Sequence, residues 1–225
     1  VGAEVVYVND ELAFGLPNGI GPEVTAMKDA GVELVIGCID LNGMKTLGEE
    51  LQRQGMDDVV LYHTNTYDQG FVAEAGDIFE GDYVSAAFRP FEAAPNDSLS
   101  LYKEWMAETD SELTEMAMFG WINADLAYQG ILAAGEDFDR QKVIDATNEM
   151  TEYTADGLVQ PIDWSRQHEP ATQEDPATHG PKYDCIAYVK VTDGEFVVVG
   201  DEEKPWSCWP GETRDWSDPE DMDFE

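Results

Sequence analysis

The chain has 225 residues, of which 43% are hydrophobic and 11% aromatic, so its composition is that of a folded protein and not of a disordered one. Acidic residues outnumber basic residues by 48 to 12, for a formal net charge of −36, which disfavours binding to nucleic acid or to anionic membrane headgroups. No stretch approaches the ~18 apolar residues that a membrane-spanning helix needs. The acidic excess fits a solvated surface that maintains solubility, or else attraction for cations or a high-salt habitat.

Strand and helix patterns alternate over the first ninety residues. The opening sequence VGAEVVYV predicts a strand at residues 3–8, and because no initiating Met or signal peptide comes before it, we expect a processed product or a part of a longer protein. The nearly unbroken apolar run at 32–39 suits a strand buried on both faces. The other predicted elements of this region are helices at 22–31 and 43–55 and strands at 58–64 and 82–91. This succession predicts an α/β fold with a parallel sheet and helices on both faces.

Helices dominate after Pro90. They are predicted at 98–109, 111–135 and 139–150, and the middle one is expected to bury an apolar stripe made of Leu113, Met116, Ile122, Leu126 and Ile131. A short edge strand at 157–164 is interrupted by Pro161 and is followed by a polar loop at 166–182. A hairpin at 183–200 turns at Asp193-Gly194, and an acidic tail closes the chain.

No enzymatic or metal-binding signature is present. The sequence lacks GxSxG, HExxH, Walker and GxGxxG patterns, and the glycine-rich GLPNGIG (15–21) fits a flexible loop. His168 and His179, with Glu169, Glu174 and Asp175 nearby, form a solvated loop more readily than a metal site. The acidic run DWSDPED lacks the central glycine of a calcium loop. We therefore predict no catalytic residue, no metal and no cofactor.

The chain has three cysteines, Cys38, Cys185 and Cys208, and no CxxC pair. A bridge between Cys185 and Cys208 in an oxidising compartment would add about 3 kcal/mol through the entropy of the unfolded state. Two free thiols are the alternative. Cys38 is expected to be a buried small residue.

Polar residues follow two of the predicted parallel strands. CIDLNG supplies Asp40 and Asn42, and YHTNTYDQG supplies Asn65 and Tyr67. In open α/β sheets, ligands lie outside the carboxyl ends of the strands, where helix N-termini offer free backbone N–H groups. These four residues are therefore the candidate ligand-binding set. The alternative is that Asp40 or Asn42 is only a helix N-cap and NTYDQG only a turn.

One long stretch runs from PEVTAMKDAGVELVIGCIDLNGMKTLGEELQRQGMDDVVLYHTNTYDQG to SAAFRPFE. It is followed by LYKEWM, GWINADLAYQGILAAG, FDRQKVIDATNEM, DGLVQPIDW and the final hairpin. Together these stretches resemble the C-terminal two-thirds of type I periplasmic binding proteins. These are the leucine/isoleucine/valine-type substrate-binding components of ABC transporters. The resemblance covers about residues 1–200. It implies the periplasmic-binding-protein-like I fold, in which two lobes enclose a small solute by hinge closure.

Carried onto this chain, the resemblance implies a C-terminal lobe at 1–89 and 183–200, a helical part of an incomplete N-terminal lobe at 91–180, and an acidic tail at 201–225. The helices of 91–150 would then have uncovered apolar faces, and the isolated chain would bind its ligand weakly or not at all. In this family a loop carboxylate binds the ammonium group of an amino-acid ligand, and the resemblance places Asn65 at that position. Either Asp40 takes over this role, or the ligand is an amide or another neutral solute.

Three functions remain open. The first is a non-enzymatic solute receptor that delivers a small polar solute to a membrane ABC permease, in the periplasm or outside the cell and with a possible lipid anchor on a missing N-terminus. The second is a sensory receptor with the same fold. The third is a hydrolase or transferase on a flavodoxin-like sheet, which would need a nucleophile and a base that the sequence does not display.

Overall fold

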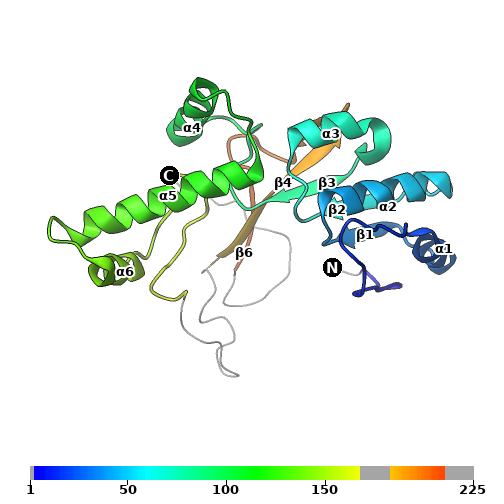
Figure 1. Ribbon diagram of the computed structural model, residues 1–225, viewed down its shortest axis with the longest axis horizontal. Coiled ribbons are helices and arrows are strands. Elements are labelled where there is room, and N and C mark those ends of the chain that lie inside the picture. Colours follow the sequence, from blue (N-terminus) through cyan, green and yellow to red (C-terminus); the bar gives the residue numbers. More distant parts are fainter. Residues whose placement is uncertain (1–2, 168–182, 211–225) are drawn as a thin grey trace. The chain divides into compact units, whose positions relative to one another are not determined.

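The computed structural model describes residues 3–167 and 183–210 (Figure 1). The chain divides into two compact units. Unit 1 comprises Val1–Ala86 and Tyr188–Val199, and unit 2 comprises Ala87–Ala187 and Gly200–Glu225. The backbone therefore passes from one unit to the other after Ala86, after Ala187 and after Val199.

Unit 1 is built on a sheet whose first three strands are parallel. Strands β1 (Leu34–Gly37), β2 (Val60–His63) and β3 (Tyr83–Ala86) lie in that order, followed by β4 (Tyr183–Thr192) and β5 (Glu195–Val198). The pairs β1–β2 and β2–β3 are parallel, whereas β4 and β5 form an antiparallel hairpin. This arrangement confirms the predicted α/β class.

The hairpin turn follows directly from its sequence. Asp193 and Gly194 both have positive φ angles, 54° and 75°, as a two-residue turn with the twist of its flanking strands requires. Glycine adopts this conformation without a steric cost, so the Asp-Gly pair fixes the register of β4 against β5.

The helices of unit 1 begin and end at residues that their sequence supplies. Helix α1 (Gly21–Ala30) has Pro22 in its first turn and ends at Gly31, which is left-handed. Helix α2 (Leu41–Arg53) begins after its N-cap Asp40, and the buried residues Met44, Leu47 and Leu51 recur at helical spacing. The short helix α3 (Gln69–Ala75) runs into the 3-10 turn η1 (Gly76–Phe79), and neither was predicted.

Helix α2 lies unusually close to η1. A Cβ atom added at Gly48 would stand 2.7 Å from Cγ2 of Ile78, a distance that real side chains do not adopt. Gly48 is therefore needed for this close approach, and it brings the helix that follows the Asp40 turn directly against the η1 segment.

Unit 2 is mostly helical. It contains α4 (Asp97–Glu108), α5 (Glu115–Ala134), α6 (Arg140–Asn148) and β6 (Trp206–Pro210), which pairs with the first half of β4. Its core is a chain of aromatic contacts through Phe88, Phe91, Tyr102 and Trp121. Large apolar side chains of α4 and α5 are exposed, as the sequence resemblance implied: Leu101, Trp105, Met116, Tyr128 and Leu132.

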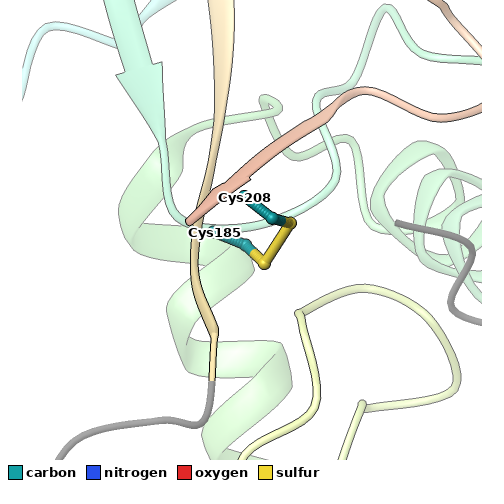
Figure 2. Close-up of a disulfide and its surroundings, with 2 residues drawn as sticks. All are labelled: Cys185 and Cys208. Carbon is teal, nitrogen blue, oxygen red and sulfur yellow. A yellow bond between two sulfur atoms is a disulfide. The ribbon is translucent and has the colours of Figure 1, made fainter. Parts of the chain in front are cut away.

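A disulfide joins β4 to β6 (Figure 2). The bonded residues, Cys185 and Cys208, are direct cross-strand partners, and both are buried. The predicted bridge is therefore present in the structure. The bridge covalently links β4 to β6 where the two strands pair antiparallel in unit 2.

Two predicted strands are absent from the described residues, and one unpredicted strand is present. Residues 3–8 form no strand and pair with none of the described strands, although they line a cavity together with β1. Residues 157–164 contribute only an isolated bridge between Tyr153 and Ile162, since Pro161 has no N–H to donate to a ladder. Conversely, β6 forms within the segment expected to be a tail.

Three burial predictions were wrong. Cys38 is exposed, because the chain leaves the sheet immediately before it. Leu34 and Ile36 are exposed as well, so β1 is not buried on both faces. In α5, Ile122 is buried as predicted, but Met116 lies on the exposed side and Met118 takes its place in the core.

Among the helices that the structure describes, none combines the length and the apolar character needed to cross a membrane.

Candidate functional site

The carboxyl ends of β1 and β2 lie side by side. Gly37 and His63, the last residues of the two strands, are direct partners in the parallel register. The hydroxyl of Thr64 donates a hydrogen bond of 3.1 Å to the carbonyl oxygen of Gly37, which joins the turn after β2 to the end of β1. The two polar turns that the sequence singled out, at 40–42 and at 64–68, therefore leave the same edge of the sheet.

Asp40 is held by backbone groups of two segments. Its carboxylate accepts a hydrogen bond from the N–H of Gly43, as a helix N-cap does, and another from the N–H of Gly15. The Gly15 bond is the main cause that lowers the pKa of Asp40, and the N–H of Gly43 acts in the same direction. The ionised form of the carboxylate is thus favoured and two of its lone pairs are used, and it holds the start of the glycine-rich loop that was predicted to be flexible.

The two amide side chains of the set are open to solvent. Asn42 is exposed in the first turn of α2, and Asn65 is exposed in the turn after β2. Within the described part of the chain, neither side chain forms a hydrogen bond to another residue. Each amide offers one acceptor oxygen and two N–H donors, which is the inventory needed to bind a small polar molecule.

Tyr67 lies inside unit 1. The side chain is buried, and its ring meets the ring of Phe196 edge-on at a centroid distance of 5.0 Å. The next residue, Asp68, caps α3 by accepting a hydrogen bond of 2.8 Å from the N–H of Phe71. In this conformation Tyr67 therefore anchors the turn that carries Asn65, and its ring is not open to solvent.

A buried polar network beneath the same edge was not foreseen. Nε2 of His63 lies 3.0 Å from Oδ2 of Asp82, and Nδ1 of His63 lies 3.2 Å from the hydroxyl of Thr66. Oδ1 of Asp82 accepts a hydrogen bond from the N–H of Leu61. Burial raises the pKa of Asp82, while the hydrogen bonds from His63 and Leu61 act against that shift. A histidine at the end of an apolar strand was the available signal, because a buried imidazole needs partners.

The described residues contain no group of three or more side chains suited to holding a metal ion. The weak metal candidates of the sequence, the loop with His168 and His179 and the acidic run DWSDPED, lie outside the described residues. Among the residues that the structure describes, the edge formed by β1 and β2 thus offers hydrogen-bonding groups: the amides of Asn42 and Asn65 and the partly occupied carboxylate of Asp40.

Comparison with known proteins gives a family and a fold. The sequence model of a family described as "Periplasmic binding protein" matches residues 1–194. No curated protein matches the chain.

Several solved structures share the fold at low sequence identity. A leucine-binding protein, LivK, from Thermotoga maritima has a TM-score of 0.61 and 11% identity, and the match covers 80% of this chain and 47% of that one. A branched-chain amino acid ABC transporter protein from Thermus thermophilus with bound valine gives 0.57 and 19%, covering 81% and 48%. An ABC transporter solute-binding protein from R. palustris in complex with benzoate gives 0.59 and 16%, covering 83% and 47%. The chain thus spans about half the length of these structures, which fits an incomplete second lobe.

Proposed function

The chain belongs to the periplasmic binding protein family, and from this we propose that it is a solute-binding component of an ABC-type importer. Its ligand is a small polar solute such as an amino acid or an amide. Its partner is an ABC permease in the membrane, and its location is the periplasm or the cell exterior. The relatives with solved structures support this direction, because they are a leucine-binding protein and ABC transporter components.

Each candidate residue has a distinct role in the proposal. Asn42 and Asn65 provide hydrogen bonds to the solute from the two turns that share one sheet edge. Asp40, with two of its lone pairs directed at the N–H groups of Gly15 and Gly43, keeps acceptor capacity for a solute N–H group. Tyr67 supports the Asn65 turn from below by its contact with Phe196.

The observation that carries the proposal is the pairing of Gly37 with His63 at the ends of β1 and β2. It brings two solvent-open amides to one edge of a parallel sheet, the place where open α/β sheets bind their ligands. The amides also suit the kind of ligand that two relatives bind, since valine and benzoate both carry a carboxylate that amide N–H groups can bind.

Isothermal titration of the longest natural protein that contains these residues, called the full-length protein below, against a panel of amino acids, amides and aromatic carboxylates tests the proposal. We expect one class of solute to bind, and the Asn42→Ala and Asn65→Ala variants to lose about tenfold in affinity each, the worth of one buried hydrogen bond. Asn123→Ala is the matched control, because Asn123 is an exposed amide on helix α5 of unit 2. Unchanged affinity in both asparagine variants would remove these residues from the site, and the lack of binding to any solute in the panel would count against the receptor function.

The same titration on residues 1–225 alone separates the site from the whole protein. Because the chain spans about half of its relatives' length, we expect binding that is much weaker than in the full-length protein, or none. Equal affinity in the two forms would show that the described edge is sufficient for binding.

A further inference from the structure

The two ring nitrogens of His63 face different partners. Nε2 lies 3.0 Å from Oδ2 of Asp82, and Nδ1 lies 3.2 Å from the hydroxyl oxygen of Thr66. The ring of Phe79 packs edge-on against the imidazole at a centroid distance of 5.0 Å. His63, Thr66 and Asp82 are 1%, 0% and 4% exposed, so bulk water does not replace either partner. The orientation of the imidazole is therefore set by the fold.

Asp82 determines which ring nitrogen carries the proton. Oδ1 of Asp82 accepts a hydrogen bond of 2.8 Å from the N–H of Leu61, and Oδ2 faces Nε2 of His63. Because an ionised carboxylate only accepts hydrogen bonds, Nε2 must be the donor. In a neutral imidazole the other nitrogen is then an acceptor. Nδ1 therefore accepts a hydrogen bond from the hydroxyl of Thr66.

Thr66 belongs to the turn that carries Asn65. Its carbonyl oxygen accepts a hydrogen bond of 3.0 Å from the N–H of Asp68, the N-cap residue of α3. On the other side of Asn65, the hydroxyl of Thr64 donates to the carbonyl oxygen of Gly37. Asn65 thus lies between two tethered neighbours, and the position of its exposed side chain depends on both of them.

We propose that His63 is a positioning residue of the candidate site. With its proton held on Nε2 by Asp82, it accepts a hydrogen bond from Thr66 at Nδ1 and so keeps the turn at 64–68 in the conformation that presents Asn65. A turn that is ordered in advance loses no further conformational freedom when a solute binds, and this raises the affinity. The role in solute binding rests on the proposed function, whereas the anchoring of the turn does not.

Hydrogen–deuterium exchange of the full-length protein tests the anchoring without a solute. In the Thr66→Val variant, which removes the hydroxyl, we expect the amides of 64–68 to exchange at least about fivefold faster, while those of β1 change little. Thr66→Ser restores the hydroxyl and should bring exchange to within about twofold of the wild type. Thr147→Val is the matched control: it removes a hydroxyl that donates to the carbonyl oxygen of Val143 within α6 of unit 2, and should leave 64–68 unchanged.

Solute affinity separates positioning from a merely structural role. The probes are L-valine, acetamide and benzoate, one from each class of the panel. For a probe that binds, we expect Thr66→Val to lower the affinity about fivefold and Thr66→Ser to restore it. In the Asn65→Ala background, Thr66→Val should cause almost no further loss, because it acts through Asn65.

Nitrogen-15 NMR of the imidazole reads the position of the proton directly. The His63→Gln variant identifies the signals of His63 among those of the three histidines. At neutral pH we expect a protonated Nε2 and a bare Nδ1 in the wild type. In Asp82→Asn the carboxamide oxygen must face the N–H of Leu61, so its NH2 group donates to Nε2 and the imidazole proton moves to Nδ1.

Three results would overturn the proposal. A wild-type imidazole with its proton on Nδ1, or with protons on both nitrogens, would mean that Nδ1 does not accept from Thr66. Equal exchange at 64–68 in Thr66→Val and in the wild type would mean that this bond does not hold the turn. An equal loss of affinity with and without Asn65 would reduce Thr66 to a structural residue.

Failure of the proposed function has a separate signature. If none of the three probes binds the wild type, the receptor function and the role of His63 in solute binding both fall. The NMR and exchange results then decide by themselves whether His63 anchors the turn at 64–68.

Discussion

His63 and Asp82 form a buried pair across two neighbouring parallel strands, with Nε2 of the imidazole 3.0 Å from Oδ2 of the carboxylate. His63 ends β2, and Asp82 lies immediately before β3. The second carboxylate oxygen accepts a hydrogen bond from the N–H of Leu61, so Asp82 is connected both to the backbone and to the side chain of β2. The pair therefore links two strands directly below the edge that carries Thr64 and Asn65.

Removing Asp82 should destabilise unit 1. In the Asp82→Ala variant, the imidazole of His63 and the N–H of Leu61 lose their partner inside the fold, and we expect a loss of about 3 kcal/mol in the free energy of unfolding. Urea denaturation followed by circular dichroism measures it. Asp77→Ala, at an exposed position of η1, serves as the control and should change the free energy by less than about 0.5 kcal/mol. A loss no larger than in this control would show that the pair contributes nothing to stability.

Asp40 should make the free energy of unfolding depend on pH in the acid range. Because the N–H of Gly15 and then that of Gly43 lower its pKa in the folded state, the ionised carboxylate contributes stability above the unfolded value of 3.8. That contribution is lost as the pH falls through the lower folded-state pKa. Asn also caps helices well, so Asp40→Asn keeps the cap and removes the charge.

The difference in unfolding free energy between wild type and Asp40→Asn, measured by urea titration from pH 7 to pH 2.5, should favour the wild type at pH 7 and shrink at the acid end. A second variant, Asp29→Asn, removes a charge from an exposed site in the last turns of α1 and should show no such trend. A difference that grows as the pH falls would have the wrong sign for a carboxylate with a lowered pKa.

Breaking the disulfide should weaken unit 2. The double variant Cys185→Ser and Cys208→Ser removes a bridge with a sequence separation of 23, which corresponds to about 3 kcal/mol in the chain-entropy model. Dithiothreitol should lower the unfolding midpoint of the wild type and leave that of the double variant unchanged. Cys38→Ser, which alters the exposed cysteine at the end of β1, should respond to the reductant like the wild type. More than one thiol that reacts with a labelling reagent in the untreated protein would contradict the bridge, because only Cys38 is free.

Salt should stabilise the chain. A formal charge of −36 makes the folded state repel itself, and ions at about 1 M reduce the screening length to roughly 3 Å. We expect the thermal midpoint to rise steadily from 0.05 M to 1 M KCl. Sucrose at matched osmolarity controls for exclusion of the solute from the surface. A flat or falling midpoint would mean that the acidic side chains are too well dispersed for repulsion to matter.

Patterns with strong local signals predicted the fold well. The parallel order of β1, β2 and β3 followed from alternation along the chain, and the hairpin followed from Asp193-Gly194, whose conformation is encoded by two residues. Residues 3–8 have an equally strong strand pattern, yet no described strand pairs with them, so they form no ladder. Helix α3 has only 7 residues, too few for a periodic signal.

The candidate site was predictable in position and less so in detail. The order of strands and helices was enough to bring the turns at Asp40 and Asn65 to one edge, because parallel strands end together. The sequence could not reveal that Gly15 donates to Asp40, since the partners are 25 residues apart with no pattern linking them. Nor could it show that the ring of Tyr67 turns inward to meet Phe196. Contacts between distant segments are decided by packing, which single-sequence patterns do not encode.

The close approach of α2 to η1 at Gly48 has a consequence for recognition. Because even a methyl group at Gly48 would overlap Ile78, we expect α2 to keep its position against η1 and to present the Asp40 turn of the proposed site in one geometry. Solute binding at the proposed site would then avoid most of the entropy loss of ordering that turn. A substitution as small as Gly48→Ala, made outside the proposed contact residues, should therefore lower the affinity through a shifted helix.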